Sequence, residues 1–201
     1  MKYDGIFFDF DGVLADSEPL HFASWADVLG GLGISLDWET YVAHCIGVSD
    51  LEMLDFFAEL SQGRMTREEF RPHYDRKQRV FRARASVTPL ILAPTVDMVR
   101  SLNGVRRAVV TSSVQAEIEP ILARSGVLSL LNTAVYGGDV TRLKPAPDPY
   151  LLAAVRTQAE NPLVFEDSDA GVASAVAAGF DVVRVKSPAD LPALVRASLL
   201  D

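Results

Sequence analysis

The sequence has little cysteine and no long apolar run. Its 201 residues include one cysteine, Cys45, so no disulfide can form within the chain, and we expect a reducing, cytoplasmic environment. Cys45 lies in the apolar segment 41–46, where a packed side chain is a better interpretation than a nucleophile. No stretch of about eighteen apolar residues predicts a membrane span, and the first residues lack a signal-peptide pattern. We therefore expect no membrane partner.

Basic residues are also fewer than acidic residues. Lys and Arg number 19 against 27 Asp and Glu, which gives a formal net charge of −8 and argues against nucleic acid as the main partner. An acidic protein that handles anions needs local cations, so the positions of its basic residues matter. A hydrophobic content of 49% is ample for a core, and the length allows one full domain with a small second one.

The segment 3–16 places two carboxylates directly after an apolar run. Residues 6–8 are predicted to form a buried strand, and Asp9, Asp11 and Gly12 follow it. Carboxylates next to a buried strand need an exposed strand end and cationic partners. Because open parallel sheets bind ligands at the carboxyl ends of their strands, this pair is predicted to bind a hard cation. The competing interpretation is a turn with two solvated aspartates.

Four helices in succession are predicted after this strand. They cover residues 18 to about 30, 38–45, 49–60 and 66–84. Their predicted capping residues are Ser17, Asp37, Ser49 and Thr66, the last in a capping box with Glu69. The fourth helix is crowded with arginine and lysine, and we interpret these residues as a solvated basic face.

Strands and helices alternate in the rest of the chain. The predicted strands are 107–111, 133–136, 163–165 and 181–185. The predicted helices are 96–102, 113–125, 147–158, 170–178 and 191–199, with Ser113 as the capping residue of the second. This alternation predicts an α/β fold, a parallel sheet flanked by helices, with the all-helical block as an insertion.

Polar side chains occur where three of the predicted strands end. They are Asp9 and Asp11 after the first strand, Thr111, Ser112 and Ser113 after the second, and Glu166 and Asp167 after the strand near 165. Lys144 precedes a proline-rich loop. Taken singly, these are an ordinary helix cap, a loop and a surface charge. Together at one sheet edge they suit a divalent metal with a phosphate.

These residues resemble the four motifs of the haloacid dehalogenase superfamily. The matching segments are 8–17, Thr111, Lys144–Pro145 and Glu166–Asp167, and they extend over nearly the whole chain. The helical insertion and the Glu-Asp-Ser-x-x-Gly form at 166–171 resemble its phosphatase and β-phosphoglucomutase branch. The resemblance implies a Rossmann-like core over 1–15 and 85–201 and a four-helix cap domain over 16–84.

The residue types then predict a mechanism. Asp9 would attack phosphorus to form an aspartyl-phosphate, and Asp11 would protonate the leaving oxygen and later activate water. Thr111 and Lys144 would bind phosphoryl oxygens. Mg²⁺ would be held by Asp9, the backbone carbonyl of Asp11 and Asp167, with Glu166 as a ligand or a partner of the ligands. Further candidates for phosphate or substrate binding are Gly12, Ser112, Ser113, His21 and Asp16.

Asp11 also favours one reaction class. The resemblance implies that dehalogenases lack this second aspartate, so we expect a phosphatase of a small phosphorylated metabolite, with sugar phosphates among the candidates. We also expect the protein to be monomeric and cytoplasmic. His21 matches a histidine of β-phosphoglucomutase-like sequences and keeps a mutase as the alternative. Against it, Asp50 stands where the mutases carry an arginine for the distal phosphate. A phospho-receiver module is the alternative of another class, but it needs neither Asp11 nor a lid of about seventy residues.

Overall fold

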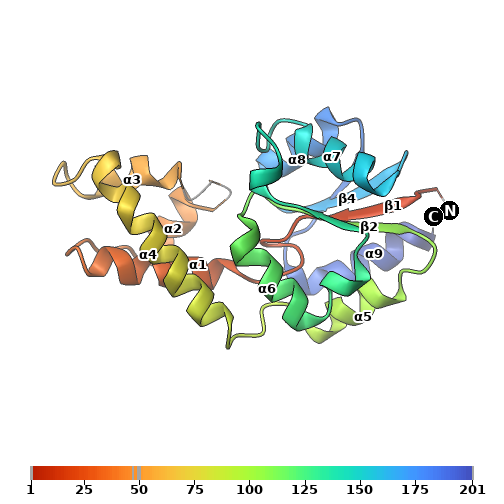
Figure 1. Cartoon of the computed structure of the whole chain (residues 1–201), viewed down its shortest axis with the longest axis horizontal. Helices are drawn as coiled ribbons and strands as arrows, with labels where there is room; N and C mark the ends of the chain where they lie inside the picture. Colours follow the sequence, from red (N-terminus) through yellow and green to blue (C-terminus); the bar gives the residue numbers. More distant parts are fainter. Residues whose placement is uncertain (1, 47, 49–50, 201) are drawn as a thin grey trace. The chain divides into compact units, whose positions relative to one another are not determined.

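A computed structural model describes residues 2–46, 48 and 51–200 (Figure 1). The chain forms two compact units, which we call the core unit (Met1–Asp16 with Pro89–Asp201) and the helical unit (Ser17–Thr88). The helical unit is thus an insertion in the sequence of the core unit. The sequence predicts the two boundaries at 15/16 and 84/85.

The core unit is built on one parallel sheet, as predicted. Its strands are β1 (Gly5–Phe8), β2 (Arg106–Val110), β3 (Thr133–Val135), β4 (Pro162–Glu166) and β5 (Asp181–Arg184). Their order is β3-β2-β1-β4-β5, and every pair is parallel. All four residues of β1 are buried, because this strand has a neighbour on each side and helices over both faces. The first strand of the chain therefore lies at the centre of the sheet (Figure 1).

Helices cover both faces of this sheet. They are α5 (Ala93–Ser101), α6 (Gln115–Ser125), α7 (Asp148–Thr157), α8 (Asp169–Ala177) and α9 (Leu191–Leu200). Helices α7 and α8 lie on one face and α5, α6 and α9 on the other (Figure 1). For α5 to α8, which connect successive strands, this is the arrangement that right-handed crossovers require. The described chain also has three short 3₁₀ turns that are not among the predicted elements: η1 (Leu128–Leu130), η2 (Gly137–Asp139) and η3 (Pro188–Asp190).

Two predicted helix starts in the core unit are wrong. Helix α5 begins at Ala93, three residues before the predicted start, because Pro94 fits the first turn of a helix instead of breaking the chain. Helix α6 follows Val114, and Ser113 makes no capping bond. The Ser113 hydroxyl donates instead to the Asp11 carboxylate.

The described part of the helical unit contains four helices, as predicted. They are α1 (Glu18–Gly30), α2 (Trp38–His44), α3 (Met53–Leu60) and α4 (Arg67–Ala85). Their buried side chains, among them Trp25, Phe57 and Phe70, form one apolar core. None of the described helices is both long enough and apolar enough to cross a membrane.

The capping predictions in the helical unit have mixed outcomes. Asp37 accepts a hydrogen bond from the Thr40 amide, and Thr66 and Glu69 form the predicted capping box. The prediction for Ser17 is wrong, because this residue already has helical dihedral angles and its side chain cannot turn back onto the first amides. Ser49 lies outside the described residues, and α3 begins behind Glu52.

The basic face of α4 is only partly solvated. Arginines 67, 71, 76 and 79 are exposed, as predicted. Lys77, however, is completely buried, so the prediction of a solvated side chain is wrong there. Its ammonium lies 2.8 Å from Nδ1 of His21 and 5.2 Å from the centre of the Phe81 ring. The aliphatic stem and the aromatic surroundings allow a lysine to occupy an interior position of this helix.

Candidate active site

The three central strands bring the predicted site residues to one edge of the sheet. Phe8 of β1 pairs with Val109 of β2 and with Phe165 of β4, so the residues that follow are neighbours. The Asp9 amide continues this pairing and donates to the Phe165 carbonyl at 3.0 Å. Asp9, Thr111 and Glu166 with Asp167 therefore converge, as the sequence predicts for the carboxyl ends of parallel strands.

An acidic cluster lies at this edge. Asp9, Glu166 and Asp167 each offer a carboxylate oxygen, and these oxygens lie within 4.8 Å of one another. Asp9 is 7% exposed and Glu166 is fully buried. Several carboxylate oxygens at this spacing fit the ligand preference of a hard cation such as Mg²⁺. The cluster thus meets the chemical requirement of the predicted metal site.

Lys144 reaches this cluster from the loop before α7. Its ammonium donates to Oδ1 of Asp9 at 2.6 Å, to Oε1 of Glu166 at 2.6 Å and to the carbonyl of Val110 at 2.9 Å. All three ammonium protons therefore have acceptors. The interpretation of Lys144 as a surface charge is excluded, because its side chain is only 6% exposed.

Burial and charge shift the pKa values in this cluster. Burial, assisted by the carboxylates of Glu166 and Asp167, raises the pKa of Asp9 well above its ordinary value. Burial acts on Glu166 in the same direction, but the charge of the Lys144 ammonium and the hydrogen bonds from Lys144, Ser168 and Tyr150 together lower the pKa of Glu166. Burial alone would lower the pKa of Lys144, yet the negative charge of Asp9 helps to raise it well above its usual range. The lysine is therefore charged at neutral pH.

Glu166 is held from both sides of its carboxylate. Oε2 accepts the amides of Asp167 and Ser168 at 2.9 and 3.1 Å. Oε1 accepts the Tyr150 hydroxyl at 3.0 Å in addition to Lys144. A Cβ at Gly171 would lie 1.7 Å from Oε1, so this position on α8 must be glycine. Tyr150 was not a predicted site residue, although it ends the proline-rich loop that follows Lys144.

A turn after β1 places Asp11 and Gly12 beside the cluster. Gly12 has a φ of +73°, and a Cβ there would lie 2.1 Å from Oδ2 of Asp167. Glycine is needed for both reasons. The Asp11 carboxylate accepts the Ser113 hydroxyl at 2.9 Å, which joins the ends of β1 and β2. Asp16 is exposed and is not a member of the described acidic cluster.

The residues after β2 form a compact hydroxyl-bearing turn. Thr111 is 2% exposed, and its side-chain oxygen accepts the Ser113 amide at 3.0 Å. Ser112 is half-buried between them. The turn orients the Thr111 side chain at the same sheet edge as Asp9. Its position agrees with the predicted role in phosphate binding, which stays a prediction.

His21 belongs to the helical unit. It is 8% exposed, and its ring stacks on Phe81 at a centroid distance of 4.2 Å. It contacts Lys77, a residue that the sequence predicts to be solvated. The signal for Lys77 was its place on the same helix face as Phe70 and Phe81. Asp50, which bears on the choice between phosphatase and mutase, lies outside the described residues.

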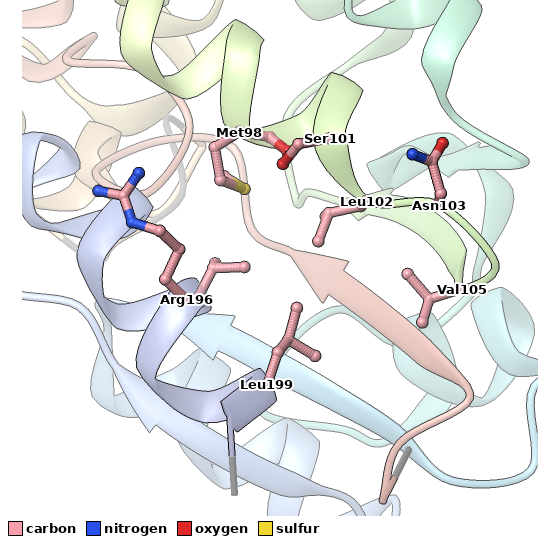
Figure 2. Close-up of a pocket in the computed structure, with 8 residues that line it drawn as sticks. Met98, Ser101, Leu102, Asn103, Val105, Arg196 and Leu199 are labelled. Atoms are coloured by element: carbon pink, nitrogen blue, oxygen red, sulfur yellow. The ribbon is translucent and has the colours of Figure 1, made fainter.

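A cavity at the opposite end of the sheet offers no comparable chemistry. Its volume is about 220 Å³, and it lies between α5, α9 and the start of β2 (Figure 2). Aliphatic side chains such as Leu102 and Val105 form most of its wall, and Arg196 is its only charged lining residue among those described. Ligand sites are usually larger than about 300 Å³ and contain convergent polar groups. The carboxylate edge is therefore the better candidate.

Comparisons with known proteins agree with this geometry. A family model described as haloacid dehalogenase-like hydrolase matches residues 6–185. The chain is 36% identical over 192 residues to fructose-1-phosphate phosphatase YqaB of Escherichia coli, covering 92% of this chain and 97% of that one. It is 30% identical over 207 residues to hexitol phosphatase A of the same organism, with 100% and 91% covered. The structure of CbbY from Rhodobacter sphaeroides with phosphate superposes with a TM-score of 0.78 at 25% identity, covering 90% and 84%.

Proposed function

The chain belongs to the haloacid dehalogenase-like hydrolases and hydrolyses phosphate monoesters, and on that premise we propose that it is a Mg²⁺-dependent phosphatase of a small sugar phosphate. We propose further that the reaction passes through an aspartyl-phosphate on Asp9. The observation that carries this proposal is the cluster of Asp9, Glu166, Asp167 and Lys144 at the carboxyl edge of the sheet.

The charges in the cluster support a metal requirement. Three carboxylates lie around one ammonium group, so an incoming phosphate dianion meets net negative charge. Asp9, Asp167 and Glu166 would hold the cation. When bound, Mg²⁺ would supply the positive charge that lets an anionic nucleophile approach an anionic substrate.

Asp9 is the proposed nucleophile. One carboxylate oxygen attacks phosphorus, the phosphorus–oxygen bond of the ester breaks, and the phosphoryl group stays on Asp9. Lys144, which already donates to Asp9, fixes the orientation of this carboxylate and balances charge that develops on the phosphoryl oxygens. The Thr111 hydroxyl lies at the same edge and is the proposed second phosphate ligand.

Asp11 is the proposed acid and base. It lies two residues beyond the nucleophile, and the Ser113 hydroxyl holds its carboxylate. In the first step it gives a proton to the leaving alkoxide, and in the second it takes one from the water that hydrolyses the phosphoaspartate. A group that alternates in this way needs a fixed position near the leaving oxygen, and the bond from Ser113 provides such a restraint.

The relatives support sugar phosphates as the substrate class. Two of them are, by their names, a fructose-1-phosphate phosphatase and a hexitol phosphatase, and both match this chain along most of its length. The alternative is a phosphosugar mutase, which would have to retain a second phosphate while the first reacts. We propose the hydrolase because Asp50 is acidic where a mutase requires a cation for that phosphate.

The test is phosphate release from a panel of monoesters that includes fructose 1-phosphate and hexitol phosphates. Wild-type protein is assayed with Mg²⁺ and with EDTA, beside Asp9→Asn and the control Asp97→Asn, an exposed aspartate on α5. We expect Mg²⁺-dependent release that Asp9→Asn abolishes and Asp97→Asn retains. Isomerisation of β-glucose 1-phosphate faster than release would replace the hydrolase by a mutase. Mg²⁺ binding without any turnover would favour a phospho-receiver module.

A further inference from the structure

Tyr150 is a buried tyrosine that contacts the acidic cluster. It lies in the first turn of α7 and is completely buried. Its hydroxyl donates to Oε1 of Glu166 at 3.0 Å, the same oxygen that accepts Lys144 at 2.6 Å. The Lys144 ammonium also lies 5.1 Å from the centre of the tyrosine ring. Tyr150 therefore touches both the anion and the cation that are proposed to orient Asp9 and the phosphate.

Packing alone does not account for the hydroxyl group. The ring belongs to the apolar cluster between α7 and the sheet, together with Phe7, Val110 and Ala153. A phenylalanine ring would fill the same space, and a phenol at this depth needs a hydrogen-bond acceptor. The one it has is the carboxylate of Glu166. The hydroxyl is thus directed at the site, and the ring is directed at the core.

The hydroxyl is a stable donor. It is completely buried with its ring, and the Glu166 carboxylate accepts its hydrogen bond. A neutral donor adds no charge that would compete with Lys144 for the carboxylates. It restricts rotation of the Glu166 carboxylate about its last bond, since Oε2 is held by the amides of Asp167 and Ser168.

We propose that Tyr150 is a positioning residue for the phosphatase reaction. Its hydroxyl fixes Glu166, and through Glu166 it fixes both the Lys144 ammonium and the oxygen that Glu166 offers to a metal ion. This inference rests on the proposed function, because it assigns Tyr150 an effect on phosphoryl transfer. It extends that function to a residue that contacts neither the substrate nor Asp9, the proposed nucleophile.

The test compares Tyr150→Phe with Tyr3→Phe. Tyr3 is also buried, but its hydroxyl donates to Asp181 at the opposite edge of the sheet. We expect Tyr150→Phe to lower kcat about tenfold and to raise the Mg²⁺ dissociation constant by a similar factor, with KM changed less than twofold. Its unfolding temperature should stay close to that of wild type, because the ring is retained. Tyr3→Phe should leave kcat and Mg²⁺ affinity unchanged.

A double-mutant cycle with Glu166→Gln tests the route of the effect. If Tyr150 acts through Glu166, adding Tyr150→Phe to Glu166→Gln produces no further loss of kcat or of Mg²⁺ affinity. Independent losses that multiply, or a Tyr150→Phe variant with wild-type kcat and Mg²⁺ affinity, would overturn the inference. If no ester is hydrolysed, the proposed function fails, and calorimetric Mg²⁺ titration still decides the role of Tyr150. A wild-type protein that neither turns over an ester nor binds Mg²⁺ would refute both.

Discussion

Gly171→Ala is predicted to damage the site from a position that makes no contact with substrate. The new Cβ would lie 1.7 Å from Oε1 and 1.9 Å from Cδ of Glu166, far inside van der Waals contact. A flexible side chain could move away at little cost. Glu166 is not flexible, since the amides of Asp167 and Ser168, the Tyr150 hydroxyl and the Lys144 ammonium hold it.

The expected loss of stability follows from these contacts. An alanine in α8 favours the helix by about 1 kcal/mol over glycine. Overpacking costs about 1–3 kcal/mol, and separation of Glu166 from Lys144 in a buried pair costs about 3–5 kcal/mol. The net destabilisation is therefore at least about 3 kcal/mol. For a protein of this size it corresponds to a fall in Tm of roughly 6–12 °C.

The measurement is thermal unfolding by calorimetry or circular dichroism. Tryptophan fluorescence does not suit the purpose, because Trp25 and Trp38 both lie in the helical unit. Gly138→Ala is the matched control, since a Cβ at Gly138 has no neighbour within 4 Å, and its free energy of unfolding should change by less than about 0.5 kcal/mol. If Gly171→Ala unfolds within 2 °C of wild type and keeps its phosphatase activity, the reasoning about a rigid Glu166 is refuted.

Three further predictions concern the charged groups. Asp11→Asn should lower phosphate release about 10²–10⁴-fold with little change in stability, and a kcat near wild type would exclude its acid–base role. Lys144→Met leaves two buried carboxylates without their ammonium, so calorimetry should show a loss of about 3–5 kcal/mol, and an unchanged Tm would contradict the buried pair. Without metal, stability should fall as the pH rises above about 4, the pKa of an aspartate in the unfolded chain. The fold raises the pKa of Asp9, so the protonated form of Asp9 stabilises the fold below this pH, and the contribution is lost as the pH rises through the folded pKa. The pKa of Glu166 is lowered, so the stability that Glu166 contributes is lost only at more acidic pH. In urea unfolding experiments at a series of pH values, Asp9→Asn should remove the dependence of the free energy of unfolding on pH.

Much of the core unit could be predicted from local sequence. Short apolar runs between turn residues marked all five strands to within one residue at each end. The pattern is clearest for β1 and β4, whose residues are all buried, since a strand buried on both faces has a nearly continuous apolar sequence. The parallel arrangement then placed Asp9, Thr111 and Asp167 at one edge without any knowledge of distances. Residues that are far apart in the sequence therefore lie close together because each follows a strand of the same parallel sheet.

Side-chain partners could not be predicted in the same way. Ser113 stands where a helix cap is expected, but Asp11, 102 positions away in the chain, competes for its hydroxyl. The burial of Lys77 depends on the packing of α4 against α1, and the contact from Tyr150 to Glu166 depends on how α7 lies on the sheet. Such contacts follow from tertiary packing, whereas capping and periodicity are local properties of the chain.

The hydrogen bond from the Asp16 amide to the Leu90 carbonyl, 3.1 Å long, has an evolutionary consequence. It joins the two backbone segments at which the chain leaves the core unit and returns to it, so the helical unit is inserted at what is effectively one point of the surface. An insertion whose ends meet can be exchanged for another without shifting a strand. A chimaera joined at these two residues should therefore retain the folded sheet.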